Sequence, residues 1–75
     1  MSIITIIVNG TEEFWTDHHI TYEQVVQIAF PGSTADQLFS VTYANKHGHD
    51  GLLAPGGSTE VKDGIKFNVV KTNRS

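Results

Sequence analysis

The chain has 75 residues, of which 39% are hydrophobic, and a formal net charge of -3. This length gives room for one domain, and the composition is typical of a soluble fold rather than of a disordered or fibrous chain. The five basic residues do not cluster, which argues against nucleic acid as a partner. No cysteine is present, which excludes disulfides, thiolate zinc sites and a cysteine nucleophile and favours a cytoplasmic location.

The first apolar run, residues 3–8, predicts a β-strand because all six of its residues are β-branched. No basic segment precedes this run, and a glycine-containing turn follows too soon for a secretory signal, so we expect no membrane partner. Asn9-Gly10 suits a two-residue hairpin turn, in which both positions need a positive φ. We therefore expect Thr11 to Asp17 to return as the second strand.

A two-residue turn also predicts which residues face each other across this hairpin. One face would carry the pairs Val8 with Thr11, Ile6 with Glu13 and Ile4 with Trp15, and the other Ile7 with Glu12 and Thr5 with Phe14. The face with Trp15 is the expected core face, although Glu13 fits it only at the rim. A bulged turn would exchange the two faces and is kept as an alternative.

A helix is predicted to follow Thr21, which has the form of an N-cap with Gln24 as its capping-box partner and Ile20 stapled onto Val25. Its buried stripe comprises Tyr22, Val25, Val26 and Ala29, with Phe30 beside it. Pro31-Gly32 should end the helix after about three turns, and this helix must lie on a sheet to be stable.

The second half of the chain predicts further strands. Phe39, Val41 and Tyr43 alternate with polar or small residues, and Ile65, Phe67 and Val69 alternate again after the tight turn Asp63-Gly64. Between them we expect a polar loop over 45–51 and a very short edge strand at Leu52-Leu53. Gly56-Gly57, after Pro55, is expected to be a turn rather than a processing site, because the sheet needs both flanking segments.

The predicted order β-β-α-β-(β)-β, with the last strand at the sheet centre, is the ubiquitin-like β-grasp arrangement, an α+β fold in which a mixed sheet packs on one helix. We assign residues 1–70 to this domain. Residues 71–75 are polar and without periodicity, and are predicted to form a flexible tail.

Several segments resemble the bacterial multiubiquitin family of ubiquitin-like domains over nearly the whole chain. They are Ile4-Thr-Ile-Ile-Val-Asn-Gly10, Tyr22-Glu-Gln-Val-Val26, Ala29-Phe-Pro31, Val41-Thr-Tyr43, Leu53-Ala-Pro-Gly56, Val61-Lys-Asp-Gly64 and Phe67-Asn-Val69. These motifs are turn signals and core positions, so they identify a family without indicating any chemistry.

The resemblance implies a protein modifier without enzymatic activity of its own, carried by its C-terminus through a ubiquitination-like pathway and often arranged as tandem domains. The implied partners are enzymes similar to ubiquitin-activating and conjugating enzymes, and a zinc-dependent deubiquitinase-like peptidase. Self-association, as a non-conjugated interaction module, is the alternative.

The predicted conjugation terminus is Arg74 and Ser75. Ubiquitin ends in two glycines, which pass through the narrow channels of its enzymes, whereas this sequence ends Lys71-Thr-Asn-Arg-Ser75. Conjugation at Ser75, processing of a longer chain and the non-conjugated module are therefore all kept as alternatives.

No catalytic or metal-binding group is predicted. The pair His18-His19 and the run His47-Gly48-His49-Asp50 are interpreted as loop or rim residues, because a zinc site needs three or four ligands fixed in tetrahedral geometry. Scattered serines and threonines without a nucleophile or phosphate-loop motif indicate no enzyme, and no cofactor is expected.

The open face of the sheet is the predicted protein-interaction patch. In the register above this face carries Ile3, Ile7 and Phe14, with Val70 expected nearby on the last strand. Scattered exposure of single apolar residues, which is common on monomers, is the alternative.

Overall fold

The structure is a computed structural model that describes residues 3–34, 36–46 and 48–72. The elements in chain order are β1 (Ile4–Val8), β2 (Thr11–Trp15), β3 (His19–Thr21), α1 (Tyr22–Ala29), β4 (Phe39–Ala44), β5 (Asp50–Leu53), β6 (Ser58–Glu60) and β7 (Ile65–Lys71). Within these described ranges, no helix has the length and apolar character needed to cross a bilayer.

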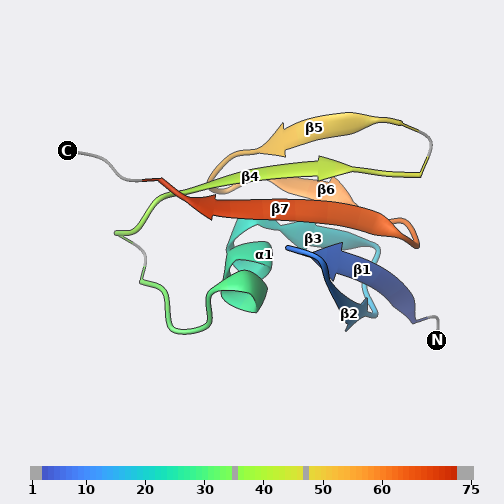
Figure 1. The fold of residues 1–75 in the computed structure, drawn as a ribbon, viewed down its shortest axis with the longest axis horizontal. Coiled ribbons are helices and arrows are strands. Elements are labelled where there is room, and N and C mark those ends of the chain that lie inside the picture. Colours follow the sequence, from blue (N-terminus) through green and yellow to red (C-terminus); the bar gives the residue numbers. More distant parts are fainter. Residues whose placement is uncertain (1–2, 35, 47, 73–75) are drawn as a thin grey trace.

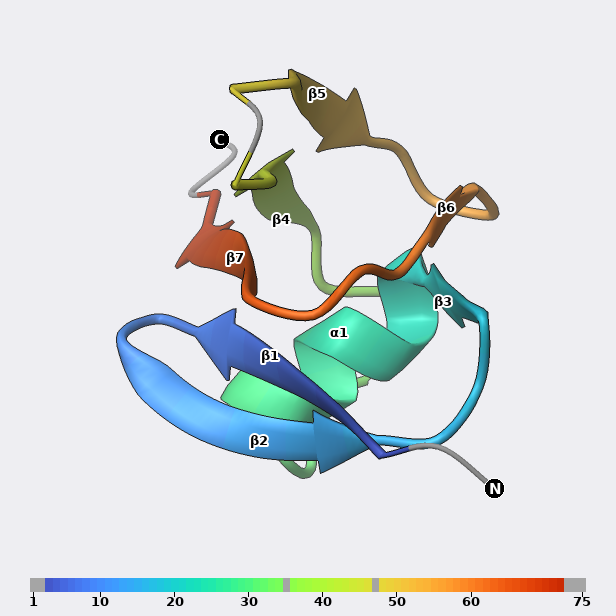
Figure 2. The same cartoon turned by 90° about the vertical axis from the view of Figure 1, so that its right-hand side faces the viewer.

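Five strands form one sheet in the order β2-β1-β7-β4-β5, with β7 at its centre (Figure 1). The pair β1 and β7 is parallel and the other pairs are antiparallel, so the sheet is mixed. Figure 2 shows α1 lying across one face of this sheet, while no helix of the described residues lies over the other face. The predicted β-grasp fold is confirmed.

The first hairpin has the register predicted from its two-residue turn. Asn9 and Gly10 both have a positive φ, of 52° and 84°, and Ile6 pairs with Glu13. Glu13 is half-buried, which fits a position at the rim of the core. The predicted strand to Asp17 is too long, because β2 ends at Trp15, whose indole N–H bonds the His19 carbonyl where the chain turns back.

Helix α1 begins with the predicted capping box. The Thr21 hydroxyl accepts from the Gln24 backbone N–H, and the Gln24 side chain accepts from the Thr21 N–H. The helix is shorter than predicted, with 8 residues or little more than two turns. Phe30 lies outside the helical region at φ -135°, because the α conformation is disfavoured before Pro31. Its ring stacks on Phe39 with the centroids 5.1 Å apart.

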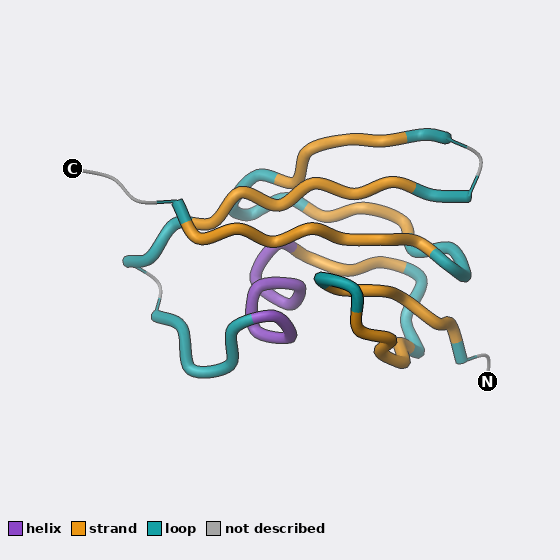
Figure 3. The backbone as a smooth tube through the Cα atoms, viewed as in Figure 1, coloured by secondary structure: helices purple, strands orange, loops and turns teal. Residues whose placement is uncertain are grey.

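Two strands were not predicted. β3 and β6 form a separate antiparallel pair (Figure 3). Ile20 of β3 lies opposite Thr59 of β6. The polar loop predicted over 45–51 is also shorter than expected, because β5 begins at Asp50 and pairs with the end of β4. β7 runs through Lys71, one residue into the segment assigned to the tail.

The core lies between the sheet and α1 and is apolar. Among the described residues, no buried side-chain nitrogen or oxygen lacks a hydrogen-bond partner. The residues buried in this core are Ile6, Val8, Ile20, Tyr22, Val25, Val26, Phe39, Val41, Leu53, Val61, Ile65, Phe67 and Val69. Every apolar position predicted for β1, β4 and β7 on the core face therefore contributes to it, with Ile4 and Tyr43 packed at its border.

Side chains complete both ends of the parallel β1/β7 pair. β1 ends at Val8, opposite Phe67, so the strand has no backbone group that pairs with Val69. The Asn9 side-chain amide takes that place: its Oδ1 accepts from the Val69 N–H at 2.8 Å, and its Nδ2 donates to the Val69 carbonyl at 3.1 Å. At the opposite end, an Asp63 carboxylate oxygen accepts from the Thr5 N–H at 2.9 Å.

Candidate protein-interaction face

The outer face of the five-stranded sheet is formed by the residues that alternate with the core positions. The register of the strand pairs places these residues in rows that run across the sheet. One row runs through Glu12, Ile7, Lys66, Ala44 and Asp50, and the next through Asn68, Thr42 and Leu52. Asn9, in the turn after β1, lines the same face beside the second row. Apolar, amide and charged side chains therefore share this face.

The predicted patch residues at the β1/β2 end lie together. Phe14 is opposite Thr5, which places it diagonally beside Ile7, and strand alternation puts Ile3 on the same face. Phe14 is 71% exposed and Ile3 67% exposed, whereas Ile7 is half-buried. We call these three residues the Phe14 cluster.

Val70 is not part of the Phe14 cluster. Ile7 pairs with Lys66, and Val70 lies four residues further along β7, about 13 Å away at the usual rise of a strand. Its own neighbour is Ser40 on β4, and its side chain is half exposed. The expectation that Val70 adjoins Ile7 is therefore wrong.

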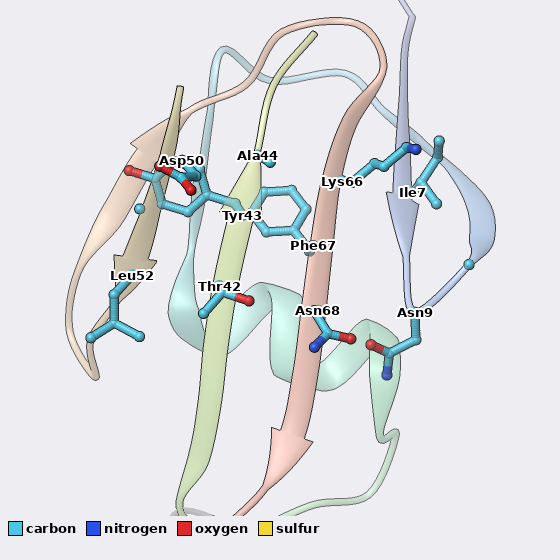
Figure 4. A pocket seen from close by; sticks show the side chains of 12 residues that line it. Ile7, Asn9, Thr42, Tyr43, Ala44, Asp50, Leu52, Lys66, Phe67 and Asn68 are labelled. Atoms are coloured by element: carbon cyan, nitrogen blue, oxygen red, sulfur yellow. The ribbon is translucent and has the colours of Figure 1, made fainter. Parts of the chain in front are cut away.

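A shallow groove of about 940 Å³ crosses the middle of the outer face (Figure 4). Ile7 and Lys66 lie at its β1 side and Leu52 at its β5 side, with Thr42 and Asn68 between them. Leu52 is 68% exposed and was predicted only as part of an edge strand. Its alternation with the buried Leu53 was the signal that could have placed it on this face.

The histidines do not gather into a metal site in the part of the chain that is described. No group of three or more metal-ligating side chains occurs there, and His47 lies outside the described residues. His18 and His19 contribute backbone hydrogen bonds to the fold. The His18 carbonyl accepts from the Val61 N–H, and the His19 carbonyl accepts from the Trp15 indole N–H.

The carboxyl group of Asp36, in the loop after α1, has a lowered pKa. The Thr34 hydroxyl donates to the Asp36 carboxylate, which lowers the pKa of Asp36, and the Asp36 backbone N–H acts in the same direction. The carboxylate is exposed, so this bond organises the loop after α1 and indicates no catalytic role.

The predicted conjugation residues, Arg74 and Ser75, lie outside the described residues. The described chain reaches Thr72, whose N–H and hydroxyl both donate to the Leu38 carbonyl, at 3.0 and 2.9 Å. These bonds hold Thr72 beside Leu38, the residue before β4.

The fold and its uncovered outer face define a ubiquitin-like domain of the β-grasp class. A family model for multiubiquitin matches residues 4–73, and the chain belongs to that family. Comparisons with curated proteins and with solved structures found no match.

Proposed function

We propose that this chain is a bacterial ubiquitin-like modifier, cytoplasmic and without enzymatic activity of its own. The observation that carries the proposal is its membership of the multiubiquitin family over residues 4–73. Activating and conjugating enzymes supply the chemistry, and the β-grasp body supplies recognition. The carboxylate of Ser75, or one exposed by processing of a longer chain, is adenylated with ATP and then passed to a target protein.

The first prediction concerns the tail. Incubation with ATP and with enzymes of the ubiquitin-activating and conjugating kind is expected to give a covalent adduct, visible by intact mass and on a non-reducing gel. A version lacking Arg74 and Ser75 should give none, because it ends in a different carboxylate and a shorter arm. If this truncated version reacts as well as the full chain, Ser75 is not the conjugation terminus.

The second prediction concerns the Phe14 cluster. Phe14→Ala together with Ile7→Ser is expected to weaken binding to the activating enzyme at least about fivefold, because exposed apolar anchors dominate the energy of such interfaces. Titration by calorimetry measures this affinity. Phe14 is 71% exposed in the free chain, so its truncation should leave the fold intact.

Leu52→Ser is the matched control for that experiment, because Leu52 is equally exposed and lies on the same face at the opposite edge strand. The control should bind as the unmodified chain does. Unchanged affinity in the Phe14 and Ile7 double variant would remove the cluster as the docking site.

The second candidate function is a non-conjugated module that binds these enzymes or further copies of itself. The exposed apolar side chains of the Phe14 cluster favour it, because such a surface serves non-covalent recognition without any reaction of the tail. Stable complexes without an adduct, in the tail experiment above, would support this function over the modifier.

A further inference from the structure

Asn9 carries a reactive sequence. Of the four asparagines in the chain, it alone precedes a glycine. Because glycine has no β-carbon to hinder the approach, the Gly10 nitrogen can attack the Asn9 side-chain carbon Cγ. A bond from the Gly10 nitrogen to Cγ then forms and the bond from Cγ to Nδ2 breaks. Nδ2 leaves as ammonia, taking up the proton of the Gly10 amide. Water next opens the cyclic imide to aspartate or isoaspartate.

The native structure opposes the first step of this reaction. Both polar atoms of the Asn9 side chain are bonded to Val69 on the neighbouring strand, at 2.8 and 3.1 Å. These bonds fix the side-chain amide on β7 and oppose its rotation toward the Gly10 nitrogen. Attack therefore requires both bonds to break, which means that this end of the β1/β7 pair must open. Water has free access, because Asn9 and Gly10 are exposed.

The deamidated product cannot form both of the hydrogen bonds that Asn9 makes with Val69. An aspartate at position 9 still accepts from the Val69 N–H, but it has no N–H to donate to the Val69 carbonyl. Two acceptor oxygens would then face each other where the amide and carbonyl now lie 3.1 Å apart. Isoaspartate would in addition lengthen the turn by one backbone carbon and displace the side chain from β7.

We propose that Asn9-Gly10 is a deamidation site that is protected in the folded chain and that reacts when the end of the β1/β7 pair opens. Conversion weakens the hold on β7 at Val69, two residues before this strand ends at Lys71. The site therefore lies where the sheet passes into the C-terminal segment. Its modification marks chains that have opened, and the lost amide makes the change permanent. This inference does not depend on conjugation.

Deamidation of the native chain is the first test. The rate is followed in mildly alkaline buffer by peptide mass mapping, which detects the gain of just under one dalton at Asn9. It should be about tenfold or more slower than in a synthetic peptide of residues 7–14, because only opened molecules react. Urea should raise the rate of the chain toward that of the peptide. Equal deamidation rates in the folded chain and in the peptide would show that the fold does not protect Asn9, and would overturn the proposal.

Gly10→Ala provides the chemical control. The variant and the unmodified chain are compared in urea, so that both are unfolded and differ only in the chemistry of the attack. The added β-carbon hinders attack, so the mass gain at Asn9 should slow strongly. Asn68, which precedes Val69, should stay unmodified over the same period in both chains. An Asn9 rate unaffected by the Gly10 change would mean that the mass gain arises by another route.

Two variants test the permanence of the change. Asn9→Asp reproduces the aspartate product, and Asn9→Gly keeps a residue tolerant of positive φ while removing the amide. Both should melt below the unmodified chain, and Asn9→Asp should exchange the Val69 amide hydrogen faster. Equal melting temperatures for Asn9→Asp and the unmodified chain would show that the amide pair does not hold β7.

Discussion

Replacing Tyr22 by phenylalanine is expected to lower the free energy of unfolding by about 1–3 kcal/mol, because it leaves buried polar groups unpaired. The Tyr22 hydroxyl accepts from the Phe39 N–H at 2.9 Å and donates to the Phe39 carbonyl at 3.3 Å. These backbone groups face away from β7, and β5 ends at Leu53, opposite Val41, too early to reach them. The hydroxyl therefore serves as the partner that β5 does not provide.

Urea unfolding followed by the fluorescence of Trp15, the single tryptophan, measures this loss. Tyr43→Phe is the matched control, since no hydrogen bond from the Tyr43 hydroxyl occurs within the described part of the chain. The Tyr22 variant should unfold at clearly lower urea than the Tyr43 variant. The same midpoint for both would show that the two bonds to Phe39 contribute nothing net.

Ile6→Ala is expected to have the largest effect, a loss of about 2–5 kcal/mol, since truncation of a buried isoleucine leaves a cavity. Ile6 is 0% exposed and lies on β1 between Glu13 of β2 and Ile65 of β7. Small domains have total stabilities of about 5–15 kcal/mol, so this one change removes a large share.

Ile3→Ala removes the same atoms from a side chain that is 67% exposed, and should change the stability by less than about 0.5 kcal/mol. Ile6→Val, with an expected loss of about 0.5–1.5 kcal/mol, keeps the test informative if the alanine variant does not fold. Thermal and urea unfolding of all three provide the comparison. Equal losses at positions 3 and 6 would contradict the assignment of Ile6 to the core.

Local features of the fold could be predicted from the sequence. The turn at Asn9-Gly10 sets the register of its hairpin through the positive φ at both positions, and Thr21 with Gln24 marks the helix start. Each depends on residues a few positions apart. The resemblance supplied the family, which the match over residues 4–73 confirms.

Features that join distant segments could not be predicted in this way. β3 and β6 have three residues each and no alternating apolar pattern, so nothing in either segment indicates the other. The position of Val70 depends on the register between β1 and β7, which the short turn after β1 does not set. For the same reason the bonds from Asn9 to Val69, 60 residues apart, appear only in the folded chain.

The central position of β7 has a consequence for the synthesis of this protein. The hairpins β1/β2 and β4/β5 leave the ribosome first, and each is a two-stranded ribbon, which is marginally stable in water by itself. Only Ile65–Lys71 joins them into one sheet. Folding of the five-stranded sheet therefore waits until β7 has left the ribosome, and a nascent chain whose β7 is still inside the exit tunnel exposes apolar side chains of both hairpins to chaperones and proteases.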